Sequence, residues 1–184
     1  MNRNFLGPIA AIAIVAGGGA AVAQSNPRVG GAAMLTTRNI VENAVNSKDH
    51  TTLVAAVKAA DLVPTLSGPG PFTVFAPTNA AFAALPAGTV DTLLKPENKA
   101  ALTGVLTYHV VPGKMDAATL LQQITAGKGT ASLKTVQGGT LTAKTSGGKV
   151  MITDEKGGTA NVTIADVIQS NGVIHVVDKV LLPK

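Results

Sequence analysis

The segment that most constrains the fold lies at the end of the chain, from Asn171 to Pro183. It opens with Asn-Gly, a pair that favours a tight turn because both residues tolerate positive φ. Val and Ile follow almost without interruption up to Val177, and strands this rich in β-branched residues are usually covered on both faces. We therefore expect a turn followed by a doubly buried strand, in which His175 is the one polar side chain.

The first residues have the three-part pattern of a secretory signal peptide. Arg3 supplies a positive charge, residues 5–16 are apolar, and Ala21-Val22-Ala23 fits an A-x-A cleavage site. The apolar run is shorter than the roughly 20 residues that a spanning helix needs. We expect a protein exported to a bacterial periplasm or secreted, with no membrane span after cleavage. The expected divisions are a signal peptide at 1–23, a linker at 24–37 and one domain at 38–184.

Composition narrows the chemistry that the chain can perform. It contains no cysteine, which excludes disulfides, thiol nucleophiles and thiolate metal sites. Its formal net charge is +5, but the lysines are scattered and aromatic residues make up only 3%, so bases have little to stack on. We therefore expect no nucleic-acid binding. The lysines are interpreted mainly as solubilising residues, with weak attraction to anionic polysaccharide or membrane surfaces as the alternative.

Apolar periodicity divides the domain into a helical half and a strand-rich half. Helices are expected at 38–60 (a pair), 79–85, 89–94, 97–106 and 117–124. Two strands interrupt them, at 72–76 and 107–111. Beyond Gly127, paired glycines separate short β runs at 130–136, 140–144, 150–153 and 160–165. This order predicts an α+β fold with a largely antiparallel sheet.

Three blocks of the sequence resemble the conserved motifs of fasciclin (FAS1) domains. They run from Phe72 to Leu85, from Tyr108 to Gly113, and from Asn171 to Pro183. The resemblance implies a β-wedge, with a largely antiparallel sheet of about seven strands and helices along one side. The main departure from the family pattern is the turn at 154–158, which is more charged and richer in glycine.

Each block also has a mechanical interpretation. Pro77 ends a strand, Thr78 or Asn79 can cap the helix that follows, and Phe82 would pack that helix against the sheet. The residues to which we assign a structural role are Phe75, Pro77, Thr78, Asn79, Phe82, His109, Asn171, Gly172 and His175.

The chain has three histidines, and none has the spacing of a metal site. His50 is expected in solvent beside Asp49, whereas His109 and His175 alternate with apolar neighbours and are expected to be buried. A metal pair or an acid–base pair is the alternative, but no His-x-His or His-Glu-x-x-His pattern supplies further ligands. We therefore expect neutral imidazoles that satisfy polar partners in the core, and no metal.

Catalytic patterns are equally scarce. No serine lies in a Gly-x-Ser-x-Gly elbow, and there is no phosphate-binding or dinucleotide-binding glycine loop. Asp154 and Glu155 are adjacent, so as strand neighbours they would point to opposite faces. We expect neither an enzyme nor a cofactor.

Tyr108 is the only tyrosine, and on a strand it would face away from His109. Its ring is either a core side chain with a bonded hydroxyl or the amphipathic anchor of a binding patch. The family resemblance associates this element with adhesion. The candidate binding residues are therefore Tyr108, Pro112 and Met115.

These features imply an exported, non-enzymatic adhesion or interaction module that binds a protein or a cell-surface polysaccharide. The alternative is a carrier of a small apolar ligand, since some fasciclin-like proteins hold carotenoid-type pigments. Short helices rich in Ala and Leu, such as 117–124, could leave an apolar slot between helices and sheet.

Overall fold

The computed structural model describes residues 26–184, so the predicted signal peptide at 1–23 lies outside the described residues. The strands are β1 Arg28–Val29, β2 Ala32–Ala33, β3 Phe72–Pro77, β4 Val110–Pro112, β5 Thr130–Lys134, β6 Thr140–Ser146, β7 Lys149–Thr153, β8 Thr159–Gln169 and β9 Gly172–Val177. The α-helices are α1 Ile40–Asn46, α2 Thr51–Ala59, α3 Val63–Leu66, α4 Asn79–Ala83, α5 Thr89–Leu93, α6 Lys99–Tyr108 and α7 Ala117–Ala126. Short 3-10 turns lie at Lys48–His50 and Pro96–Asn98.

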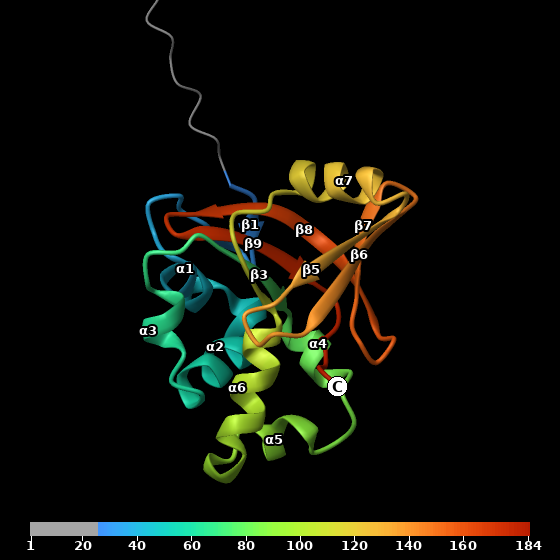
Figure 1. The fold of residues 1–184 in the computed structure, drawn as a ribbon. Helices are drawn as coiled ribbons and strands as arrows, with labels where there is room; N and C mark the ends of the chain where they lie inside the picture. Colours follow the sequence, from blue (N-terminus) through green and yellow to red (C-terminus); the bar gives the residue numbers. More distant parts are fainter. Residues whose placement is uncertain (1–25) are drawn as a thin grey trace, which may run out of the picture.

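Seven of these strands form one mixed sheet in the order β4-β3-β9-β8-β7-β6-β5. Helices α1 to α6 gather against one end of it, while α7 lies across the other (Figure 1). The predicted α+β class, the strand number and the fasciclin-like architecture are confirmed. One detail differs, because β3 and β9 run parallel whereas the remaining pairs are antiparallel.

Local sequence explains where several helices begin. Asn39 and Glu42 form a reciprocal capping box at α1. The side chain of Thr78 accepts from the backbone N–H of Ala81 at α4, and Asp116 accepts from that of Thr119 at α7. These side chains replace partners that the first helical N–H groups lack, so the starts of α4 and α7 follow from sequence.

The central strands β3 and β9 are buried on both faces, as predicted for β9. Their two faces contribute to two separate apolar clusters. The first, the helix-side core, includes Ile40, Leu53, Val57, Val74, Phe82, Leu106 and Ile174. The second, the barrel-side core, includes Phe75, Tyr108, Val111, Leu120, Leu133, Leu141, Ile152 and Val177.

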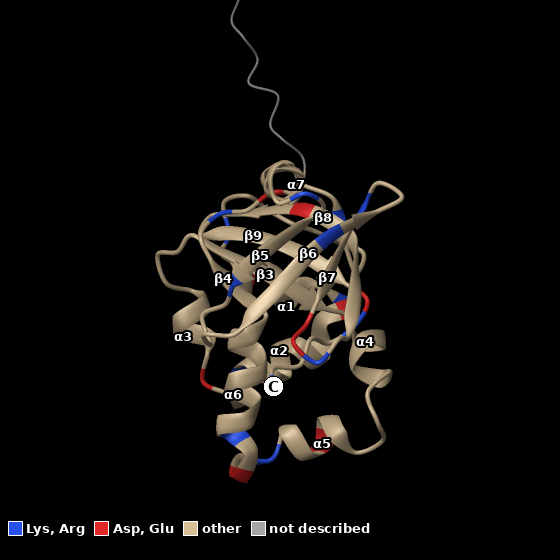
Figure 2. Ribbon diagram, turned by 45° about the vertical axis from the view of Figure 1, so that its right-hand side comes forward, with Lys and Arg blue, Asp and Glu red and all other residues tan. Residues whose placement is uncertain are grey.

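The barrel-side core is enclosed because the sheet curls almost into a barrel. The backbone N–H of Val136, just after β5, donates to the carbonyl of Val110 in β4 at 2.8 Å, which links the two ends of the sheet. Helix α7 covers the open end with Leu120 and Ile124 (Figure 2). The outer side of β5 to β8 carries no helix (Figure 2).

The expected linker at 24–37 is wrong for the residues that the structure describes. Strands β1 and β2 form a hairpin, and Val29 and Met34 are buried in the helix-side core. The Asn26 side-chain amide bonds both the N–H and the carbonyl of Ile168 in β8. Residues from 26 onward therefore pack as part of the domain.

Two local predictions are also wrong. The strand expected at 107–111 begins only at Val110, because α6 continues through Tyr108 and His109 caps it. Asn171 and Gly172 have no positive φ. Gly172 is required for another reason, since a Cβ there would overlap the carbonyl oxygen of Phe72 on the adjacent strand β3.

Candidate functional site

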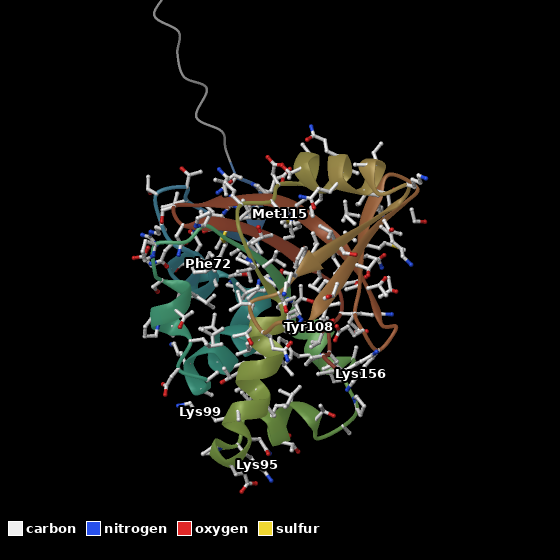
Figure 3. The ribbon with its side chains drawn as sticks, in the orientation of Figure 1. Phe72, Lys95, Lys99, Tyr108, Met115 and Lys156 are labelled. Atoms are coloured by element: carbon white, nitrogen blue, oxygen red, sulfur yellow. The ribbon has the colours of Figure 1, made fainter. Side chains whose placement is uncertain are left out.

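The Tyr108 ring is inside the protein, so of its two alternative roles the structure has the core ring with a bonded hydroxyl and not the exposed binding anchor. It is 0% exposed and lies at the end of α6 in the barrel-side core (Figure 3). Its hydroxyl donates to the Thr140 carbonyl at 2.9 Å and accepts from the Glu155 N–H at 3.0 Å. Burial raises the pKa of Tyr108 above its ordinary value. Because residue 108 ends a helix, the side chain reaches across the core rather than outward.

The other two candidate binding residues lie on the surface, in the segment that joins β4 to α7. We call residues 112–116 the β4–α7 loop. Pro112 and Lys114 are exposed, and Met115 is half-buried against the barrel-side core. Pro112 lies opposite Phe72 in the β3–β4 pairing. Figure 3 labels Met115 and Phe72 at the end of the molecule away from α5.

A buried threonine holds the middle of this loop. Thr73 on β3 is 0% exposed, and its hydroxyl donates to the carbonyl of Gly113 at 2.7 Å. The same oxygen accepts from the N–H of Met115 at 2.8 Å. One side chain thus satisfies two loop backbone groups, which fixes the loop conformation.

His175 and Asp166 hold the end of the loop. The Nε2–H of His175 donates to the Met115 carbonyl at 2.7 Å, and its Nδ1 accepts from the Asp166 N–H at 3.4 Å. Asp166 has φ of 57° at an irregularity in β8, and its carboxylate accepts from the Ala117 N–H at 2.7 Å. Side chains from β3, β8 and β9 therefore converge on one short surface loop.

All three histidines are buried and bonded as neutral rings. The prediction for His50 is wrong, since it is 2% exposed and bonded to Ser47 and the Ala76 carbonyl. His109 donates from Nδ1 to the Val105 carbonyl and accepts at Nε2 from the Leu181 N–H. Burial lowers the pKa of His109 to about 4 and lowers the pKa values of His50 and His175 as well. Each ring uses one nitrogen as donor and one as acceptor, which leaves no free nitrogen for proton transfer to a substrate.

The charged turn after β7 has a structural use that the sequence did not reveal. Asp154 is 8% exposed, and one carboxylate oxygen accepts from the N–H groups of Lys156 and Gly158. The other accepts from the Leu182 N–H at 3.0 Å, which ties the turn to the C-terminal segment. The departure from the family pattern at 154–158 is thus compatible with a well-bonded turn.

The remaining motif residues connect elements rather than face a pocket. Phe75 stacks on His175 with ring centroids 5.6 Å apart, Phe82 is buried in the helix-side core, and Pro77 is buried at the end of β3. The Asn79 side chain accepts from the Thr52 N–H and donates to the Lys48 carbonyl. Asn171 accepts from the Ile40 N–H and donates to the carbonyls of Leu66 and Gly68.

An apolar cavity of about 40 Å³ lies between the helices and the sheet. Its walls include Met34, Val54, Val57, Leu106 and Ile174. Ligand pockets usually measure roughly 300–1,000 Å³, so this cavity is too small for a carotenoid-sized molecule. It also lies against α1, α2 and α6, not against residues 117–124 where the slot was expected.

Two further features bear on function. Among residues 26–184, no group of three or more His, Asp or Glu side chains could hold a metal ion. None of the helices in this part of the chain combines the length and hydropathy needed to cross a bilayer.

Comparisons with known proteins agree with this architecture. A model of the fasciclin domain matches residues 48–183. Protein sll1483 of Synechocystis is 55% identical over 152 residues, which are 83% of this chain and 77% of that protein. Immunogenic protein MPB70 of Mycobacterium bovis is 36% identical over 183 residues, which are 96% of this chain and 86% of that protein.

A solved structure shares the fold. A FAS1 domain pair from the insect cell adhesion molecule fasciclin I matches with a TM-score of 0.69 and 18% identity, covering 79% of this chain and 51% of that one. At this identity the likeness concerns the fold alone.

Proposed function

Because the chain belongs to the fasciclin family, we propose that it is an exported, non-enzymatic interaction module that binds a cell-surface partner through the β4–α7 loop. Export is proposed from the signal-peptide pattern at residues 1–23.

The observation that carries this proposal is an exposed loop with a fixed backbone. Thr73, Asp166 and His175 are anchored in three strands and bond four backbone groups of residues 113–117. A loop that is ordered before binding loses little conformational entropy when a partner docks, so its affinity is higher.

The side chains that this loop presents suit a protein partner. Pro112 offers apolar surface opposite Phe72 and Met115 offers a half-buried apolar side chain within the loop, and Met and aromatic residues are enriched at protein interfaces. Tyr108 belongs to the same sequence block but contributes by supporting the core beneath.

Binding of the fluorescently labelled chain to envelope fragments of its source organism tests the proposal. Met115→Ser should weaken saturable binding at least about tenfold, the loss typical of a hot-spot residue. Val45→Ser is the matched control, because Val45 on α1 is 51% exposed and distant in sequence from the loop. This variant should bind as tightly as the parent chain.

A second variant tests the need for a rigid loop. Thr73→Val keeps the loop sequence but removes the donor to Gly113 and the acceptor for Met115. We expect weaker binding with a faster exchange of the Met115 amide proton. Equal binding by Met115→Ser and the parent, or no saturable binding by the parent, would contradict the proposal.

A further inference from the structure

The outer side of β5 to β8 has an unusual composition. Successive side chains of these strands point to opposite faces of the sheet. Ala, Leu, Val and Ile therefore point into the barrel-side core, and mainly hydroxyl and lysine side chains point outward. We call this outer side the hydroxyl–lysine face. One row of hydroxyl side chains crosses all four strands, since the register pairs Ser132 with Thr142, Thr142 with Thr153, and Thr153 with Thr159.

Three lysines project from the same face. Lys134 and Lys149 are exposed and Lys144 is partly exposed. Lys144 lies opposite Met151 and Lys149 opposite Ser146, so Lys144 and Lys149 are diagonal neighbours on adjacent strands. Such neighbours are about 7–8 Å apart. Figure 2 shows the blue of lysine on β6.

Strands β5, β6 and β7 contain neither Asp nor Glu, and the carboxylate of Asp166 in β8 is bonded to the Ala117 N–H. Two acidic side chains lie at its margins and are already bonded. Glu155 accepts from the Thr140 N–H, and Asp178 accepts from the backbone and side-chain N–H groups of Asn161. The ion pair found among residues 26–184 joins Lys99 to Asp61, near α6 and α2.

Protection of a sheet edge does not explain all of these lysines. Lysine on an edge strand prevents unwanted pairing with other chains, and Lys134 on β5 fits that role. Lys144 on β6, however, is already paired on both sides, with Thr130 and Met151, whereas Lys149 is paired with Ser146 alone. Lys144 and Lys149 therefore place two like charges on one face, where they raise the positive potential that an anionic ligand meets.

We propose that the hydroxyl–lysine face binds an anionic polysaccharide. Lysines attract carboxylate or sulfate groups, and the row of hydroxyls can donate to and accept from sugar hydroxyls between the charges. The face carries no aromatic ring to stack on nucleic-acid bases and no large apolar group besides Met151 to enter a membrane. This site is distinct from the β4–α7 loop and does not depend on it.

Titration of the labelled chain with polygalacturonate, a linear polyuronate, tests this site, with neutral dextran as the reference polymer. Lys134→Gln/Lys144→Gln/Lys149→Gln should weaken binding at least about tenfold. A matched triple variant, Lys48→Gln/Lys58→Gln/Lys95→Gln, removes the same charge from exposed positions outside the face and should change affinity less than about twofold. The affinity of the parent chain should fall as salt is raised from low to physiological levels.

Chemical-shift mapping locates the contact. Polygalacturonate should perturb the amides of Thr142, Lys144 and Thr153, and Met115→Ser should leave the polysaccharide affinity unchanged. Equal weakening by the two triple variants would overturn the proposal, since net charge would then suffice. Tighter binding to phosphatidylserine vesicles or to duplex DNA than to polygalacturonate would overturn it too, as would binding to neutral dextran.

Discussion

The two cores on either side of β3 and β9 are built differently. The helix-side core is apolar and leaves a cavity of about 40 Å³. The barrel-side core has fully buried side chains around Tyr108, and buried polar groups fix it to backbone atoms of distant segments. Strands β3 and β9 therefore contact a core with an unfilled cavity on one face and a core tied by hydrogen bonds to distant segments on the other.

The two cores therefore contribute to the fold in different ways. Apolar packing is non-directional, and on the helix side it is combined with a few directional bonds, from Asn43 to the Leu35 backbone and from His50 to the Ala76 carbonyl. Hydrogen bonds are directional, and on the barrel side they hold the C-terminal segment and the β4–α7 loop. The polar bonds on the barrel side include the one from His175 that positions the candidate binding loop.

The largest expected effect comes from removing one phenylalanine on each side. Phe75→Ala and Phe82→Ala should each lower the free energy of unfolding by about 3–5 kcal/mol, because both rings are buried. Phe75→Ala should be the costlier, since it also removes the stacking contact with His175. Denaturant unfolding measures both values.

Amide exchange then distinguishes the two sides. Phe75→Ala should speed exchange at Met115, whereas Phe82→Ala should not, because Phe75 stacks on His175, which bonds the Met115 carbonyl, while Phe82 lies in the helix-side core. Two results would contradict this difference between the cores. One is a loss of unfolding free energy near zero for Phe82→Ala, and the other is an equal rate of Met115 amide exchange in the two variants.

Acid should lower the stability of the fold at His109. Its folded pKa of about 4 lies below the unfolded value of 6.5, so the unfolded chain binds the extra proton first. The stability that neutral His109 contributes is complete above pH 6.5 and is lost as pH falls toward 4. The loss should be on the order of 3 kcal/mol.

Unfolding free energies measured at intervals across this pH range test the assignment to His109. His109→Gln cannot titrate there, so its stability should be lower at neutral pH but should depend less on pH. A pH dependence identical to that of the parent chain would show that other groups are responsible.

The smallest expected effect comes from adding one methylene group to each of the two cores. Val177→Ile enters the closely packed barrel-side core at a residue with 0% exposure and should cost about 1–3 kcal/mol. Val57→Ile points toward the cavity and should be neutral or stabilise by up to about 1 kcal/mol. Thermal unfolding of the pair compares them directly, and a costlier Val57→Ile would mean that the cavity cannot accept the group.

Sequence patterns predicted the parts of this fold that depend on local chemistry. The caps at Thr78 and Asp116, the doubly buried strand β9 and the strand-rich second half follow from side-chain type and spacing. The candidate site was located only in part, because Pro112 and Met115 lie on the surface loop while Tyr108 does not.

The missed residues share one property, which is a polar side chain whose partner lies far along the chain. Thr73 bonds residues forty positions away, and Asp166 bonds the start of α7 from an irregular point in β8. His175 is a single polar residue in an apolar strand, and Thr73 carries the same signal in β3.

The sequence by itself determined the class of fold, the family and the absence of cysteine chemistry, since these depend on periodicity, ordered motifs and composition. Tertiary structure decided which polar residues are buried and what they bond. Tyr108 and His50 were misplaced because burial depends on where a helix ends and what packs above it, and neither is encoded in the neighbouring residues. The parallel pairing of β3 with β9 brings Thr73 and His175 beneath one loop, so the rigidity of the candidate site is a property of the assembled sheet.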